Sequence, residues 1–202
     1  MGARSGGGGG TGDTGLERDS TYKGKIENVE SLKNIKDPKL YKEMKAAISR
    51  FYKELGLKEK NIKLADLDGN VYGIGGPGGI FLNKRYFKNA SAKEITEKFK
   101  GEYKSGWQTK TNKPVAHVIT HEMAHTVWMK GVGDAKHQAA GKEIQKVYNA
   151  WKKDGNKTKL GYGKYAGRNV SEFFAETITK AIHGKADKYT KALKGIVKKY
   201  KL

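Results

Sequence analysis

The chain has 202 residues, of which 36% are hydrophobic, and it contains no cysteine. Disulfide frameworks and cysteine zinc clusters are therefore excluded, and no apolar run reaches the roughly 18 residues of a membrane span. The formal net charge is +20, from 41 Lys and Arg against 21 Asp and Glu. This charge favours acidic partners such as nucleic acid, an anionic membrane surface or an acidic protein, although lysines spread along the chain serve solubility equally well.

The N-terminal segment differs in composition from the rest. Residues 1–20 are rich in glycine and lack the apolar stretch of a Sec signal, so we expect a flexible tether there. Residues 21–202 are expected to form one domain, since roughly 100–200 residues per domain is usual. With neither a signal nor a membrane span expected, a cytoplasmic, virion-associated or toxin-delivered location stays open.

The first predicted helix begins at Pro38. Asp37 before it is a typical N-cap, and proline is favoured at the first helical position. Apolar residues then follow at helical spacing until Gly56, a residue type that commonly ends helices.

A small sheet is predicted after this helix. Residues 61–67 and 71–74 alternate on either side of an Asp-Gly pair, which suggests a hairpin. Residues 79–83 indicate a further short strand. The stretch 66–70 also resembles a calcium loop, but that pattern lacks its turn glycine and its bidentate glutamate.

Helices are predicted for most of the remaining chain. Ser91 and Glu94 form a capping box that opens one helix, expected to end near Gly101, and Pro114 begins the next. Further helices are expected before Asp154, at about 170–183 and at the C-terminus. One helix, a small sheet and then several helices make an α+β layout.

The helix from Pro114 carries an HExxH motif. Residues four apart share a helix face, so His121 and His125 would present two imidazoles to one point. Zinc accepts neutral imidazole, and Glu122 is placed to take a proton from a water at the metal. The alternative is a buried helix with two packed histidines. His117, one turn earlier, is either a core histidine or a rival ligand.

A catalytic zinc needs a third protein ligand. Metzincin spacing is excluded, because Trp128 and Gly131 stand where that pattern needs glycine and histidine. Glu172 and Glu176 lie four apart on a partly buried helix, and a buried carboxylate pair needs a cation. Zinc held by Glu172, with Glu176 orienting a ligand imidazole, would supply one. Alternatively, Glu172 caps its own helix together with Asn169.

The second motif extends from Tyr165 to Glu176. Together with HExxH, the pattern Tyr165-x-x-x-Asn169-x-x-Glu172-Phe-Phe-Ala-Glu176 resembles the gluzincin metallopeptidases. It is similar in particular to the catalytic domain of anthrax lethal factor and to related domains in bacteriophage head proteins and bacterial toxins. The resemblance covers about residues 115–183.

This resemblance implies a zincin-like metallopeptidase domain, mostly helical with a small antiparallel or mixed sheet before the HExxH helix. It implies that His121, His125 and Glu172 bind zinc, and that Glu122 is the general base. Tyr165 would donate a hydrogen bond to the oxyanion.

The resemblance also implies a place for the substrate. Gly79, Ile80 and Phe81 fit the edge strand that lies over the zinc in this class, where an extended peptide can pair. Tyr162 is a rival to Tyr165, but its spacing from Glu172 is wrong for the pattern.

Two functions are carried forward. The first is a zinc-dependent endopeptidase, phage-associated or of toxin type, acting on a protein or peptide substrate that the charge suggests is acidic. The second is a zinc-stabilised basic module of a phage particle that contacts nucleic acid or an assembly partner. The presence of both Glu122 and Tyr165 favours the enzyme, since a silent domain could lose them and keep its metal ligands.

Overall fold

The computed structural model describes residues 24–68, 72–76, 79–128 and 134–202. The expected tether and the tip of the expected Asp-Gly turn lie outside these residues. The elements are β1 (Ile26–Ser31), the 3-10 turn η1 (Leu32–Asn34), α1 (Pro38–Leu55), β2 (Ile62–Leu67), β3 (Gly73–Gly76), β4 (Gly79–Asn83), α2 (Lys84–Phe87), α3 (Ala92–Lys104), α4 (Pro114–Trp128), α5 (Ala135–Lys153), the 3-10 turn η2 (Lys164–Gly167), α6 (Val170–His183) and α7 (Lys188–Tyr200). The fold is mostly helical with a small mixed sheet, which confirms the predicted α+β class.

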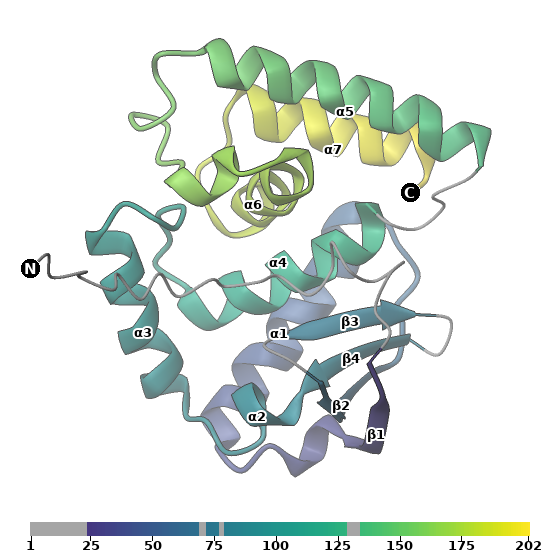
Figure 1. Ribbon diagram of the computed structural model, residues 1–202, viewed down its shortest axis with the longest axis vertical. Coiled ribbons are helices and arrows are strands. Elements are labelled where there is room, and N and C mark those ends of the chain that lie inside the picture. Colours follow the sequence, from purple (N-terminus) through teal and green to yellow (C-terminus); the bar gives the residue numbers. More distant parts are fainter. Residues whose placement is uncertain (1–23, 69–71, 77–78, 129–133) are drawn as a thin grey trace, which may run out of the picture.

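Helix α4 lies at the centre of the molecule (Figure 1). The sheet and α1 lie on one side of it, and α5, α6 and α7 lie on the other, with α6 and α1 packed directly against it. Every side chain from 117 to 127 is buried. A helix buried on all sides needs no single apolar stripe, which explains why the motif helix is apolar around most of its circumference.

The sheet has the strand order β1-β2-β4-β3. Strand β2 pairs with β4 in parallel, and β3 pairs with β4 in antiparallel fashion. The predicted hairpin between 61–67 and 71–74 is therefore wrong, because β4 separates the two strands. Leu64 and Ala65 of β2 are both fully buried, so this strand is covered on both faces, which suits an interior strand with a parallel partner.

Glycine at position 79 is required by close packing. Its φ is +117°, and a Cβ there would lie 2.3 Å from the carbonyl oxygen of Asn61. The amide of Ile80 donates to that same carbonyl at 2.9 Å. A larger residue would push β4 away from the start of β2.

The predicted helix boundaries are confirmed where capping residues mark them. Asp37 accepts hydrogen bonds from the first turn of α1, and Gly56 ends the helix with φ +66°. Ser91 and Glu94 form the predicted capping box of α3. The second oxygen of Asp37 also accepts from the amide of Ala92 at 2.8 Å, so one carboxylate fixes the starts of two helices.

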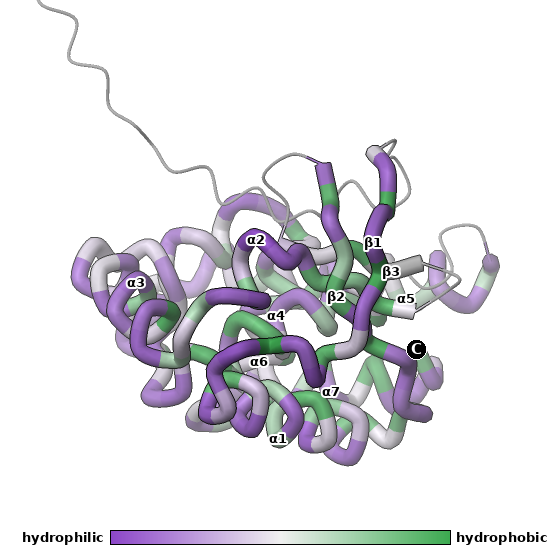
Figure 2. The backbone as a smooth tube through the Cα atoms, turned by 90° about the horizontal axis from the view of Figure 1, so that it is seen from below, coloured by the Kyte–Doolittle hydropathy of each residue, from purple (hydrophilic) through white to green (hydrophobic). Residues whose placement is uncertain are grey.

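Most buried hydrophobic side chains of the described residues form one large cluster from Leu32 to Leu202, and Ala65, Leu67 and Ile74 form a small separate cluster on the sheet. Along the outer helices α1 and α7 the chain alternates between hydrophilic and hydrophobic residues (Figure 2), as expected for helices that bury one face. Among the described residues, no helix combines the length and the hydropathy needed to cross a bilayer.

Candidate metal centre

The two motifs predicted from the sequence meet where α4 packs against α6. Helix α4 supplies His121, Glu122 and His125, and α6 supplies Glu172 and Glu176. All five are buried, and the last three of them have no exposed surface. Ionisable side chains withdrawn from water in this way need partners of opposite charge or hydrogen bonds.

Three ligand-type atoms converge on one point. The Nε2 atoms of His121 and His125 lie 3.1 Å apart. Oε2 of Glu172 is 3.2 Å from Nε2 of His121 and 3.4 Å from Nε2 of His125. These three buried residues could hold a metal ion. The carboxylate of Glu172 therefore faces the two imidazoles, in addition to any role in capping its own helix.

Helix α6 is positioned for this by its N-terminus. The side chain of Asn169 accepts a hydrogen bond from the amide of Glu172 at 2.8 Å, which starts the helix at Val170. Phe173 and Phe174 are fully buried and anchor the first turns in the core. The predicted N-cap at Asn169 is confirmed, and it sets the rotation that turns the carboxylate toward α4.

The carboxylate of Glu176 contacts the other side of the histidine row. Its Oε1 lies 2.8 Å from Nδ1 of His121 and 3.1 Å from Nε2 of His117. Its Oε2 accepts from the amide of Thr109 at 3.3 Å. A carboxylate on the second nitrogen of a ligand imidazole fixes the ring's orientation and tautomer, which is the role predicted for Glu176.

His117 does not join the three converging atoms. It shares Glu176 with His121, and these three residues form a second group that could hold a metal ion. The second nitrogen of His125, Nδ1, lies 3.0 Å from Oγ of Ser171. Both histidines of the motif thus have a polar partner on the nitrogen that faces away from Glu172.

The charges of the cluster are strongly coupled. Burial alone lowers the pKa of both histidines, but contacts with Glu172 and Glu176 raise the pKa of His121 well above its usual value. Burial prevails at His125, whose pKa is lowered. Burial would raise the pKa of both glutamates, and their imidazole contacts lower it instead.

Glu122 is the buried carboxyl beside this cluster. Its Oε2 is buried and has no hydrogen-bond partner among the described residues. Burial is the main cause that raises its pKa to about 7; the charge of His121 opposes the rise and that of Glu172 adds to it. A carboxyl with a pKa near neutrality can both accept and release a proton at neutral pH.

Tyr165 lies next to the same histidine row. Its ring is stacked on His121, with centroids 5.7 Å apart, and its side chain is 2% exposed. The amide of Tyr165 donates to the carbonyl of Trp107 at 2.9 Å. Tyr162 instead packs among Trp151 and Phe173 in the aromatic core, as its spacing suggested.

Some residues of the centre were not predicted. Ser171 and Thr109 contact the carboxylate and imidazole groups, yet a serine and a threonine give no distinct signal in one sequence. Trp107, whose ring lies 5.7 Å from that of Tyr165, could have been noticed as a tryptophan in a lysine-rich segment.

The predicted substrate-binding strand is not where it was expected. Gly79, Ile80 and Phe81 belong to β4, and both edges of β4 are paired, to β2 and to β3. The interpretation of these residues as an edge strand is therefore wrong. The strand at the edge beside α4 is β3, Gly73–Gly76.

Comparisons with protein-family models, with curated proteins and with solved structures find no match to this chain. The interpretation of the centre consequently depends on its own residues and their geometry.

Proposed function

We propose that this protein is a zinc-dependent endopeptidase of gluzincin type. The observation that carries the proposal is the convergence of His121, His125 and Glu172 beside the buried, unpartnered carboxyl oxygen of Glu122. Two imidazoles and one carboxylate with an adjacent base are the donor set of a catalytic zinc site, which keeps a coordination position open.

The distances support zinc as the ion. Zinc binds imidazole nitrogen and carboxylate oxygen at roughly 2.0–2.2 Å in tetrahedral geometry, so two such ligand atoms lie about 3.3–3.5 Å apart. The three separations at this centre are 3.1, 3.2 and 3.4 Å. A single small ion can therefore be bound with only slight movement of the side chains.

The neighbouring residues support peptide hydrolysis. When bound, zinc supplies Lewis acidity, which lowers the pKa of a water and polarises the scissile carbonyl. Glu122 takes a proton from the attacking water and passes it to the leaving amine. Tyr165 donates a hydrogen bond to the oxygen that develops negative charge. Glu176 holds the imidazole of His121 in place throughout.

The sheet edge supports an extended substrate. Strand β3 is one of the two edge strands of the described sheet, and it packs against α4, which carries the motif. An edge strand offers main-chain donors and acceptors to which an extended peptide can pair. The role first assigned to residues 79–81 is better filled by Gly73–Gly76.

The test compares the wild type with Glu122→Gln and with Glu97→Gln, a matched change at an exposed glutamate of α3. Zinc content and cleavage of a mixed peptide library are measured on the same samples. We expect equal zinc in all three proteins, with cleavage reduced about 10²–10⁴-fold only in Glu122→Gln. Chelation should abolish cleavage in every sample, and zinc should restore it in the wild type and in Glu97→Gln.

Two results would contradict the proposal. Stoichiometric zinc without cleavage by the wild type would favour the zinc-stabilised binding module. Failure to bind zinc after reconstitution of the folded protein would show that the histidine and glutamate cluster is a metal-free buried network.

A further inference from the structure

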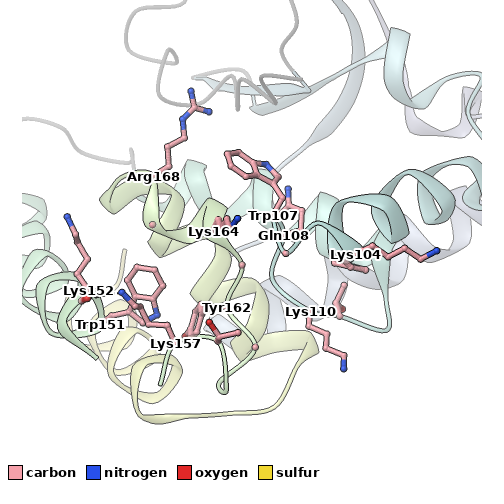
Figure 3. A pocket seen from close by; sticks show the side chains of 17 residues that line it. Lys104, Trp107, Gln108, Lys110, Trp151, Lys152, Lys157, Tyr162, Lys164 and Arg168 are labelled. Carbon is pink, nitrogen blue, oxygen red and sulfur yellow. Dashed lines mark hydrogen bonds between the residues drawn. The ribbon is translucent and has the colours of Figure 1, made fainter. Parts of the chain in front are cut away.

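A large cavity is lined by residues of the segment before α4 and of the segment around η2 (Figure 3). Its volume is 910 Å³. One wall is the segment 103–111, which joins α3 to α4, and the other comprises the end of α5 and residues 157–168. These two stretches are distant in the sequence, so only the fold creates this site.

The walls are held together by backbone hydrogen bonds. The amide of Lys110 donates to the carbonyl of Gly161 at 2.9 Å, and the amide of Lys164 donates to the carbonyl of Gly106 at 3.0 Å. A Cβ at Gly163 would lie 2.3 Å from the carbonyl oxygen of Trp107, so the two stretches touch. The base of the cavity is therefore fixed before any ligand arrives.

The lining carries one sign of charge. Six of its residues are basic, and none of its described residues is acidic. The basic residues are Lys104, Lys110, Lys152, Lys157, Lys164 and Arg168. In the described part of the chain, none of the five lysines has a carboxylate within 4.0 Å of its ammonium nitrogen. Lysines elsewhere in the described structure, by contrast, commonly form ion pairs with Asp or Glu. Like charges around a concave surface concentrate the positive field there.

Aromatic rings form the inner part of the cavity. Trp151 and Tyr162 are buried at its base, while Trp107 is 38% exposed at the side nearest Tyr165. Nε1 of Trp151 is a buried donor without a hydrogen-bond partner among the described residues. Lysine ammonium groups and an indole N–H are all donors, so the lining is complementary to a ligand rich in acceptors and negative charge.

The cavity lies close to the candidate metal centre. The ring of Trp107, which lines the cavity, lies 5.7 Å from the ring of Tyr165, and that ring lies 5.7 Å from the ring of His121. An extended peptide advances roughly 3.3 Å per residue, so about three or four residues span these two steps. A peptide held both at the centre and in the cavity would therefore have its two bound segments about that far apart.

We propose that this cavity binds an acidic stretch of a polypeptide. The assignment of the cavity as a substrate subsite rests on the endopeptidase function proposed above. A substrate bound in this way would carry glutamate or aspartate about three or four residues from the scissile bond. The short distance from the candidate metal centre favours a peptide over nucleic acid, because the proposed hydrolytic site acts on amide bonds and not on phosphodiesters.

The first test measures binding to the purified full chain at low salt. The probes are a short peptide that alternates glutamate and serine, the same peptide with glutamine for glutamate, and oligodeoxythymidylate of equal charge. Binding is followed by calorimetry and by the intrinsic tryptophan fluorescence, to which Trp107 and Trp151 of the cavity contribute, and mass spectrometry checks that each peptide stays intact. The variant is Lys110→Ala/Lys164→Ala, and the matched control is Lys45→Ala/Lys142→Ala, at exposed lysines of α1 and α5.

We expect the acidic peptide to bind the wild type and the control equally, and the cavity variant about fivefold more weakly. The glutamine peptide should not bind measurably. Equal binding of the acidic peptide to all three proteins, or no binding at all, would overturn the proposal. Tighter binding of oligodeoxythymidylate, lost in the cavity variant, would also overturn it and assign the cavity to nucleic acid.

The second test separates this proposal from the endopeptidase function. Cleavage of peptides with acidic or neutral residues about three or four positions from the scissile bond is compared for the same proteins. A preference for the acidic peptides that falls in the cavity variant alone supports the subsite. Cleavage without such a preference overturns the subsite and leaves the enzyme intact. Acidic-peptide binding without any cleavage supports the cavity and contradicts the enzyme.

Discussion

The candidate metal centre and the basic cavity are neighbours, yet they handle charge in opposite ways. In the centre, Glu172 and Glu176 are fully buried and each contacts imidazole nitrogens. In the cavity, five lysines gather, four of them exposed, and no carboxylate of the described residues lies within 4.0 Å of their ammonium nitrogens. Charges that leave water must be compensated within the fold, whereas exposed charges of one sign are tolerated because solvent and salt screen them.

This difference has a functional consequence. Interactions within the buried centre should change little with ionic strength, while any ligand held by the cavity should dissociate as salt rises. The proposed chemistry and the proposed recognition would therefore respond to different conditions, although Tyr165 beside His121 lies close to Trp107 of the cavity. Substitutions in each region can test that separation.

The largest effect is expected at the junction itself. Tyr165→Phe removes one hydroxyl and keeps the ring that stacks on His121, so zinc content should not change. If Tyr165 donates to the oxyanion, kcat should fall about 10²–10³-fold, as for the loss of one such donor. Peptide cleavage under saturating substrate, with zinc measured on the same sample, tests this.

Tyr200→Phe is the matched control for that change. The hydroxyl of Tyr200, at the end of α7, donates to Glu143 of α5, and Tyr200 lines neither the candidate centre nor the cavity, so loss of its hydroxyl should leave kcat within a few-fold of wild type. An equal fall in kcat for both variants would show that the tyrosine effect is structural.

The metal centre could be predicted because its residues follow helix periodicity. His121 and His125, like Glu172 and Glu176, are spaced by four, and such spacing places side chains on one helix face wherever the helix lies. What the sequence could not supply was the meeting of α4 with α6, since that depends on packing. The second motif led us to expect Glu172 beside the two histidines, and the structure brings these three residues together.

The sheet and the cavity could not be predicted in the same way. The order β1-β2-β4-β3 depends on a parallel pairing between strands that are not consecutive, whereas an Asp-Gly pair suggested a local hairpin. Likewise, the lysines of the cavity come from two segments that carry no periodic pattern, and they look like ordinary solvated charges. Long-range pairing of irregular segments leaves no signal in local sequence.

An intermediate effect is expected from the carboxylate that orients the metal ligand. Glu176→Gln keeps the size of the side chain but weakens its contacts with His121, His117 and the amide of Thr109. Loss of such an orienting partner typically reduces metal affinity about 10–100-fold. Competition for zinc with a chromophoric chelator measures this. The exposed Glu97→Gln serves as control, and an unchanged affinity would show that Glu176 has no orienting role.

The smallest effect concerns the far end of the same helix pair, where the described residues place no carboxylate in contact with a half-buried imidazole. His183 of α6 lies 2.8 Å from the hydroxyl of Thr120 on α4. Burial, together with the charges of Arg50, Lys113 and His117 and against a weaker effect of Glu54, lowers its pKa from 6.5 to about 4. The unfolded chain therefore binds more protons than the folded chain between these two pH values, so acidification across this window destabilises the fold. In urea titrations from pH 7 to pH 4, the free energy of unfolding of His183→Gln should fall less steeply than that of the wild type.

Arg50→Gln should make the free energy of unfolding depend less steeply on pH as well, but by a smaller amount, because it removes only one of the charges that disfavour protonation of His183. Identical slopes for His183→Gln and the wild type would mean that His183 protonates as readily in the folded protein as in the unfolded chain.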